Sequence, residues 1–134
     1  MSSNWVSDIQ KMQGKYKTRD WVRDNPEKLK EFLKFRLAFL EEELGETQLA
    51  YDNNDPEELV DGLIDLCVVA IGTLDAFGIN AYDAWDTVLI ANLNKEIGIK
   101  AERPNPLGLP DLSKPEGWTS PSHVGNHGLF KNIE

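Results

Sequence analysis

Apolar residues recur at helical spacing along most of the first hundred residues. Between residues 26 and 51 one stripe of leucines and a neighbouring stripe of phenylalanines predict a long helix. The leucines are Leu29, Leu33, Leu37, Leu40 and Leu44, and the phenylalanines are Phe32, Phe35 and Phe39. Asn25-Pro26 supplies an N-cap and a first-turn proline. A shorter helix is expected over residues 4–12, which show the same apolar spacing.

The next fifty residues predict two more helices. Asp55-Pro56 repeats the start signal, and Gly78 suits the end of the helix that follows. Residues 63–74 of this helix are apolar nearly all round, which for a helix means burial on most sides. Asn80 is expected to cap a last helix that ends near Gly98. No convincing strand pattern occurs, so the sequence predicts an all-α, antiparallel helix bundle.

The apolar helix after Pro56 needs more cover than one chain provides. We therefore expect a homodimer, or a tetramer built from two dimers. After about Lys100 five prolines and four glycines indicate an irregular tail. The expected organisation is a helical catalytic bundle over residues 1–100 and a tail over residues 101–134, packed on the same domain or on a neighbouring subunit.

The net charge of −9 is unevenly distributed along the chain. Residues 1–36 hold nine basic and five acidic side chains, residues 37–91 hold thirteen acidic and no basic ones, and residues 92–134 hold five of each. The acidic excess argues against binding to a nucleic-acid polymer. Where several of the middle carboxylates converge, they need divalent cations, protonation or basic groups from elsewhere. A solvated acidic face is the simpler alternative.

Composition places the chain among globular proteins. Apolar residues make up 40% and charged residues 28% of the chain, and no run approaches the roughly 18 apolar residues of a membrane span. The single Cys67 excludes an internal disulfide, and the first residues lack the pattern of a secretory signal. We expect no membrane partner and a cytoplasmic location, which is the host cytoplasm if the protein is encoded by a phage.

Five carboxylates have positions that favour a metal site. Glu42, Glu43 and Glu46 fall within an arc of roughly 100° on the first long helix. Asp61 and Asp65 share a face of the second, and the apolar neighbours of Asp65 make an unpaired carboxylate expensive to bury there. With the two helices side by side, Glu43, Glu46 and Asp65 present oxygens to Mg²⁺ or Mn²⁺, which prefer such ligands.

A purely structural interpretation stays open. In it Asp65 is a buried acid that is hydrogen-bonded to the backbone or to Arg36, and the glutamates are surface residues. Zinc is disfavoured, because the acidic segment holds no histidine and the two histidines, His123 and His127, lie in the tail.

This set of residues resembles the all-α NTP pyrophosphatase superfamily, in particular its single-domain MazG-like members of phage type. The family pattern is Glu-Glu-x-x-Glu, a spacer, and then Glu-x-x-Asp followed by an apolar run. Glu42-Glu43-x-x-Glu46 and Asp65-Leu-Cys-Val-Val match this pattern, and the resemblance covers approximately residues 30–100.

The resemblance implies hydrolysis of nucleoside triphosphates, often deoxy forms, to the monophosphate and pyrophosphate with Mg²⁺ or Mn²⁺. It assigns the metal to Glu43, Glu46 and Asp65, and Asp61 could add a further oxygen. Glu42 or Asp61 would orient or deprotonate the attacking water. A bound metal would cancel phosphate charge and lower the pKa of that water.

The sequence departs from the family pattern at Gly62, where relatives have the glutamate of the second motif. Asp61 could supply the missing oxygen from one residue earlier. Alternatively, Glu58-x-x-Asp61 is the true motif with its register shifted by one turn. We prefer Asp65, because the family's apolar run directly follows its aspartate.

Several residues outside the acidic segment are candidates for binding the substrate. They are Asn92, Lys95, Lys100, Arg103, Trp118 and Trp21. Asn92 and Lys95 are three apart on the last predicted helix, so the amide could meet sugar or base while the ammonium meets phosphate. Lys100 and Arg103 could neutralise phosphates. Trp118 either stacks on a base or packs the tail onto the bundle, and Trp21 is another stacking candidate.

The leading hypothesis is a metal-dependent pyrophosphohydrolase that converts (d)NTP to (d)NMP and pyrophosphate, with a purine such as dGTP or GTP preferred. One alternative is a non-catalytic helical module whose acidic face binds a basic partner. Another is a relative that binds nucleotide without cleaving it, because of the change at Gly62.

Overall fold

The computed structural model describes residues 4–98, 107–108 and 111–133. The helices are α1 (Trp5–Lys15), α2 (Thr18–Asp24), α3 (Leu29–Asp52), α4 (Pro56–Ala76) and α5 (Ala81–Leu93). Two 3-10 helices, η1 (Pro26–Lys28) and η2 (Gly128–Asn132), and two short strands, β1 (Glu96–Gly98) and β2 (Asp111–Ser113), complete the described elements. The all-α class predicted from the sequence is confirmed.

The chain divides into two compact units. The first comprises residues 1–81 and 126–134, and the second comprises residues 82–125. The division of the sequence at residue 100 therefore stays a prediction, and each unit is described by itself below.

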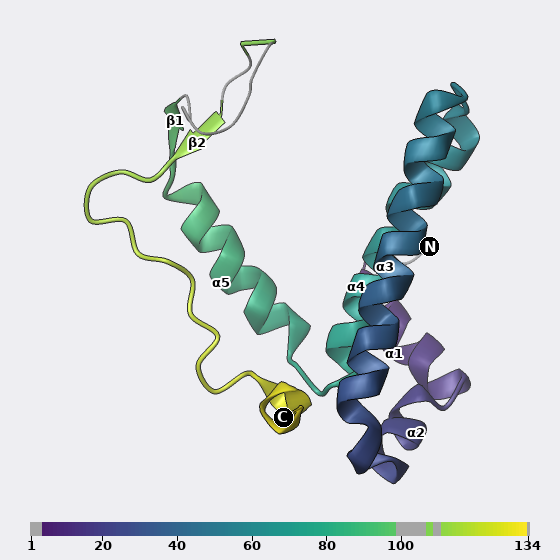
Figure 1. Ribbon diagram of the computed structural model, residues 1–134. Coiled ribbons are helices and arrows are strands. Elements are labelled where there is room, and N and C mark those ends of the chain that lie inside the picture. The colour runs from purple at the N-terminus through teal and green to yellow at the C-terminus, as the bar shows by residue number, and fades with distance from the viewer. Residues whose placement is uncertain (1–3, 99–106, 109–110, 134) are drawn as a thin grey trace. The chain divides into compact units, whose positions relative to one another are not determined.

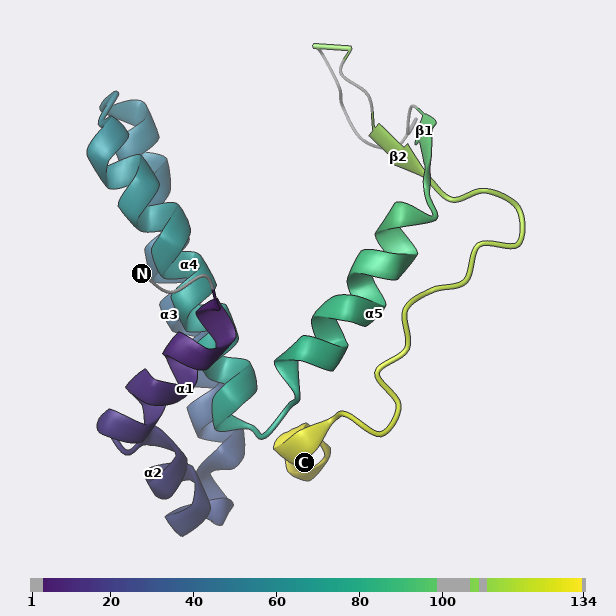
Figure 2. The ribbon, with the colours of Figure 1, turned by 180° about the vertical axis from the view of Figure 1, so that it is seen from behind.

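A long antiparallel hairpin of α3 and α4 forms the largest part of the first unit (Figures 1 and 2). Asp55 caps α4 as its sequence predicts, because its Oδ1 accepts from the Glu58 amide at 3.1 Å. Gly78, with a φ of +73°, follows the end of α4 and provides the expected stop. The predicted first helix is also confirmed, and Asn4 Oδ1 caps it by accepting from the Ser7 amide at 2.9 Å.

The core of this unit lies where α1 and α2 pack against α4. Phe77 is completely buried, with its ring centroid 5.8 Å from that of Phe32 and 4.7 Å from that of Phe130. Ile9, Val22 and further small apolar side chains complete this buried group. Burial of such side chains is the main stabilising term, at about 1.5–3 kcal/mol each for the larger ones.

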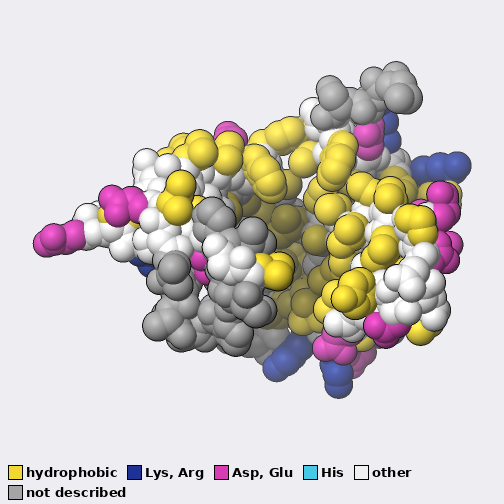
Figure 3. Space-filling model, turned by 90° about the horizontal axis from the view of Figure 1, so that it is seen from above, with side chains coloured by type: hydrophobic (Ala, Val, Ile, Leu, Met, Phe, Trp, Pro, Cys, Tyr) yellow, Lys and Arg dark blue, Asp and Glu magenta, His cyan; other side chains and the backbone are white. Residues whose placement is uncertain are grey.

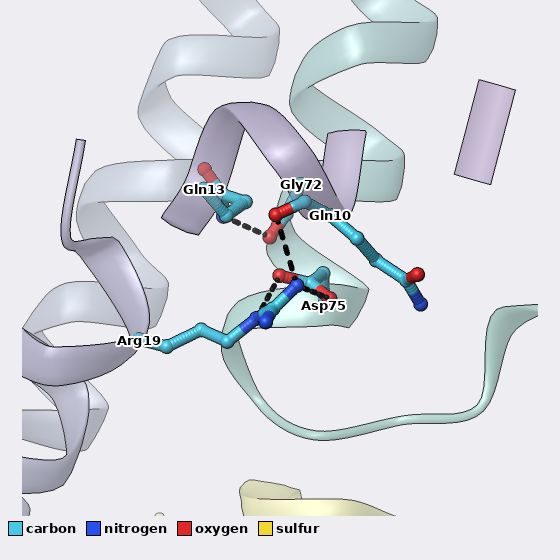
Figure 4. A network of polar contacts seen from close by, with 5 residues as sticks. All are labelled: Gln10, Gln13, Arg19, Gly72 and Asp75. Carbon is cyan, nitrogen blue, oxygen red and sulfur yellow. Dashed lines mark hydrogen bonds and ion pairs between the residues drawn. The ribbon is translucent and has the colours of Figure 1, made fainter. Parts of the chain in front are cut away.

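Polar contacts fix α1 and α2 to the last turns of α4 (Figure 4). Arg19 donates from Nε and Nη2 to the two carboxylate oxygens of Asp75 at 2.9 and 3.0 Å, and also to the Gln10 carbonyl at 3.1 Å. The hydrogen bond to Asp75 is the main reason why the pKa of Arg19 is raised. The buried Gln13 donates to the Gly72 carbonyl at 2.8 Å.

The last residues of the tail belong to the first unit. Asn126 accepts from the Asn80 amide at 2.8 Å and donates to the Asn80 carbonyl at 2.9 Å. The Leu129 amide donates to the Phe77 carbonyl at 2.7 Å. Gly128 has a φ of +51°, and a Cβ there would collide with the Phe77 carbonyl oxygen, so the close approach of η2 requires glycine.

The structure corrects three expectations about individual elements. Helix α2 was not expected, and it follows Lys17, which has a φ of +59°. Asn25 does not cap the long helix. Its side chain donates instead to the Trp21 carbonyl at 2.7 Å, and Pro26 opens η1 rather than the α-helix itself.

Helix α5 is the third correction, because it ends at Leu93 and not near Gly98. Residues Glu96–Gly98 form β1, which pairs antiparallel with β2 in the register Ile97 to Leu112. Trp118 then returns to α5, where its Nε1 donates to the Ala91 carbonyl at 2.8 Å. These contacts define the second unit.

Large apolar side chains are exposed in both units, as the yellow surface in Figure 3 shows. The hairpin exposes Leu44, Leu49, Val60 and Leu63, and α5 exposes Trp85, Ile90 and Leu93. Such surface usually marks an interaction site. The homodimer or tetramer stays a prediction. None of the described helices combines the length and apolar character that a membrane span requires.

Candidate carboxylate site on the helical hairpin

One buried carboxylate oxygen on α3 lacks a hydrogen-bond donor among the described residues. Oε2 of Glu43 is shielded from solvent and makes no hydrogen bond among the described residues. Burial raises the pKa of Glu43, and the charges of Glu46, Asp65, Glu42 and Asp61 raise it further, in that order. All five acids singled out in the sequence therefore lie close enough to interact electrostatically.

A close helix contact explains why the two aspartates face the glutamates. Gly62 packs directly on Thr47, so that a Cβ at position 62 would collide with Thr47 Oγ1. Thr47 is buried, and its hydroxyl donates to the Glu43 carbonyl at 2.8 Å. Gly62 and Thr47 thus mark the line along which α4 and α3 face each other. Asp61 and Asp65 lie to one side of this line on α4, and Glu43 and Glu46 lie to the same side of it on α3.

This packing bears on the departure from the family pattern. A glutamate cannot occupy position 62 without displacing Thr47. Asp61 and Asp65 influence the pKa of Glu43, whereas Glu58 does not appear among its causes. Asp61 is thus near Glu43, and the choice between Asp61 and a motif shifted to Glu58 as the source of the missing oxygen stays a prediction.

Asp65 is half-buried beside this cluster. Arg36, proposed as its partner in the structural interpretation, binds elsewhere. Its Nε donates to Thr73 Oγ1 and its Nη2 to the Val69 carbonyl, both at 3.0 Å. Burial lowers the pKa of this guanidinium. Among the described residues, Asp65 therefore forms no ion pair with Arg36 and lies near Glu43 instead.

The carboxylates do not form a closed ligand set. Among the described residues, no three His, Cys, Asp or Glu side chains are grouped closely enough to hold a metal ion. Like charges repel one another, which disfavours a closer approach of these side chains in the absence of a cation. The buried, unpaired oxygen of Glu43 within an all-acidic surrounding nevertheless suits a hard divalent cation.

The predicted substrate-binding residues have different locations. Asn92 is exposed near the end of α5, and Lys95 follows it with its Nζ 5.4 Å from the centroid of the Trp118 ring. Lys114 Nζ lies 5.0 Å from the same centroid. The Trp118 indole packs the tail onto α5. This agrees with the second of the two roles that the sequence suggested for Trp118, packing rather than base stacking. Lys100 and Arg103 lie outside the described residues.

Trp21 belongs to the first unit and lies near the start of α3. It lines a pocket of about 350 Å³ with Lys28, Glu31, Phe32 and Phe35. Phe32 and Glu43 are eleven residues apart on α3, which corresponds to about 16 Å along a helix. The structure therefore does not bring Trp21 to the carboxylates.

Sequence reasoning missed Thr47 as a part of the site. A threonine in a helix carries no chemical signal of its own, and its role depends on the register between α3 and α4. The unusual glycine in the apolar helix was the only available clue.

Comparison with known proteins identifies the family of the chain. Residues 17–92 match the family model of phosphoribosyl-ATP pyrophosphohydrolase, and the chain belongs to this MazG-like, all-α pyrophosphohydrolase family. The matched segment includes all five carboxylates and Gly62. No curated protein and no solved structure matches the chain.

The Glu43 carboxylate is expected to destabilise the metal-free protein at neutral pH. Because the folded-state pKa is raised above its ordinary 4.5, folding favours the protonated form. This contribution is complete below pH 4.5 and is lost as the pH rises through the folded-state pKa. Glu43→Gln keeps the shape but not the charge, so its Tm in EDTA should exceed that of the wild type at pH 7.

Thermal unfolding followed by circular dichroism across the pH range checks this prediction. The advantage of Glu43→Gln should disappear below pH 4.5. Glu41→Gln is the matched control, since Glu41 is exposed and does not contribute to the pKa of Glu43. A Glu43→Gln Tm equal to or below that of the wild type at pH 7 would contradict the argument.

Proposed function

We propose that the protein is a metal-dependent pyrophosphohydrolase that converts a nucleoside triphosphate to the monophosphate and pyrophosphate. The family places the chain among enzymes that hydrolyse phosphoanhydride bonds of nucleotides. The observation that carries the proposal is the buried, unpaired Glu43 oxygen, together with four further carboxylates near enough to raise the pKa of Glu43. Such an arrangement is unfavourable unless a cation neutralises it.

Mg²⁺ or Mn²⁺ would be held by Glu43, Glu46 and Asp65. When bound, this ion supplies neutralisation of phosphate charge and an acidified water. Asp61 flanks these ligands from α4 and can add an oxygen. Glu42 and Asp61 are both exposed, so either can accept a proton from water and return it to solvent.

The chain's own contribution is to fix the helices that carry these groups. Thr47 and Gly62 set the distance between α3 and α4, and the hydrogen bond from Thr47 ties that contact to the Glu43 backbone. Positioning and electrostatics of this kind account for most of the catalysis of phosphoryl transfer. A purine base is the preferred substrate feature in this proposal.

Product analysis tests the function. Purified protein is incubated with a panel of NTPs and dNTPs, together with phosphoribosyl-ATP, in Mg²⁺ or Mn²⁺, and the products are separated by anion exchange. Monophosphate and pyrophosphate in equal amounts are expected from one or a few triphosphates. Cleavage of phosphoribosyl-ATP alone would move the substrate to the one in the family's name.

Glu46→Ala should abolish this turnover, and Glu41→Ala should retain it. Glu41 is exposed on the same helix and does not contribute to the pKa of Glu43, so it controls for loss of an acidic side chain. Full activity in Glu46→Ala would refute the assignment of the site. No turnover by the wild type, with no rise in Tm on adding Mg²⁺ or Mn²⁺, would favour the non-catalytic acidic module.

A further inference from the structure

Aromatic side chains continue the carboxylate face of α3 toward its N-terminus. At about 100° per residue, Phe32, Phe35 and Phe39 fall within the same arc of roughly 100° as the three glutamates. The stripe of α3 is thus aromatic over its first half and acidic over its second. The two parts meet between Phe39 and Glu42.

Two of these rings are available at the surface. Phe35 is 61% exposed, and its ring centroid lies 6.4 Å from that of Phe39 in an edge-to-face arrangement with an interplanar angle of 69°. Phe39 is half-buried, and the Arg36 guanidinium carbon lies 5.8 Å from its centroid. Phe32 instead packs between Trp21 and the buried Phe77. Phe35 and Phe39 therefore form an aromatic pair with one exposed and one half-buried ring, which we call the Phe35–Phe39 platform.

The distance from this platform to the carboxylates matches a nucleotide. Phe39 and Phe35 precede Glu43 by four and eight residues, or about 6 and 12 Å along the helix. A single sugar joins the base of a nucleotide to its α-phosphate, so a base stacked within about two helix turns of Glu43 leaves its phosphates near the carboxylates. Phe35 also lines the pocket beside Trp21, but the other lining residues, Trp21, Lys28, Glu31 and Phe32, precede it in the chain and lie farther from Glu43, so we assign the base to the Phe35–Phe39 end.

We propose that the Phe35–Phe39 platform receives the nucleobase of the triphosphate whose phosphates meet the carboxylate site. This inference rests on the proposed function and adds the base-binding surface to it. An aromatic face accepts any base by stacking, and the larger ring system of a purine covers more of it.

Charge favours a nucleotide over a second copy of the chain as the occupant. A protein helix laid along this stripe would have to cover Glu42, Glu43 and Glu46 together with the rings, and burying unpaired carboxylates is costly. A nucleotide arrives with divalent cations that neutralise them. Arg36 lies beside Phe39, and the chain carries no further Lys or Arg from residue 37 to residue 91.

The separate effects of Phe35→Ala on KM and on kcat test the platform. Alanine should raise KM for the preferred triphosphate by roughly 5- to 100-fold, as expected for loss of base stacking, and should change kcat little. Phe35→Trp should restore a KM close to that of the wild type. Leu37→Ala is the matched control, since Leu37 is 52% exposed and lies on the opposite side of α3.

Sedimentation of the same variants separates the two occupants. An unchanged KM in Phe35→Ala overturns the proposal, and a simultaneous change in oligomeric state would identify the stripe as a surface between copies. If the wild type cleaves no nucleotide, the proposed function has failed by itself. Equilibrium dialysis with GTP and Ca²⁺ then decides: binding weakened by Phe35→Ala keeps the platform, and unweakened or absent binding rejects it.

Discussion

Replacement of Asp65 by asparagine is expected to lower kcat for the preferred triphosphate by at least about 100-fold. Loss of a residue that only orients a metal ligand already costs up to about 100-fold, and Asp65 is proposed to be a ligand itself. Asparagine keeps the size of the side chain but removes the negative charge that Asp65 adds to the surroundings of Glu43. The remaining carboxylates would bind the divalent cation more weakly. A metal-dependent rise in Tm should therefore be reduced in parallel with activity.

The fold of Asp65→Asn should survive, because Asp65 is only half-buried and Arg36 is engaged with Val69 and Thr73. Its Tm in EDTA should equal or exceed that of the wild type, since a repulsive charge has been removed. Glu57→Gln is the control, as Glu57 is exposed two turns earlier on α4. Undiminished turnover in Asp65→Asn, measured with steady-state kinetics, would exclude Asp65 as a ligand.

The helix ends were predicted well where one or two neighbouring residues carry the start or stop signal. Asp55-Pro56 and Gly78 bound α4 as expected, because capping and left-handed backbone conformations are properties of single residues. Helix α2 was missed since only Trp21 and Val22 in it are large and apolar, so it has no stripe to detect. The β1 and β2 strands have three residues each, which is too short for an alternating pattern.

The site could be predicted only as far as one helix at a time. Spacing placed Glu42, Glu43 and Glu46 on one face of α3, and in the structure Asp61 and Asp65 lie near enough to Glu43 to influence its pKa. Which residues meet across α3 and α4 depends on the register of two helices, which no single-helix period contains. For this reason Arg36 was placed near Asp65, although it binds one to two turns away at Val69 and Thr73.

The same register makes Gly62 a position at which even the addition of a methyl group should lower stability. Alanine in place of a glycine within a helix usually gains up to about 1 kcal/mol. A Cβ at position 62 would instead meet Thr47 Oγ1 and approach Thr47 Cβ to 3.2 Å. The hydrogen bond to the Glu43 carbonyl and the stiffness of a β-branched side chain in a helix keep this threonine in place.

Gly62→Ala is therefore expected to lower the free energy of unfolding, since overpacking costs about 1–3 kcal/mol and outweighs the gain in helix propensity. Gly62→Glu, which restores the family's acidic residue, should be at least as destabilising. Gly45→Ala on α3 is the matched control, because a Cβ there has no neighbour within 4 Å. This variant should be as stable as the wild type or more so, by up to about 1 kcal/mol.

A double-mutant cycle assigns the effect to the contact itself. Thr47→Ala removes Oγ1, so Thr47→Ala with Gly62→Ala should recover most of the stability that Gly62→Ala loses, giving a coupling energy of about 1–3 kcal/mol. Urea unfolding of the four proteins in EDTA measures this energy without reference to catalysis. Additive effects of the two substitutions would mean that α3 and α4 do not meet at Thr47 and Gly62. The flank on which Asp61 and Asp65 approach Glu43 would then have to be different, because this contact is what sets it.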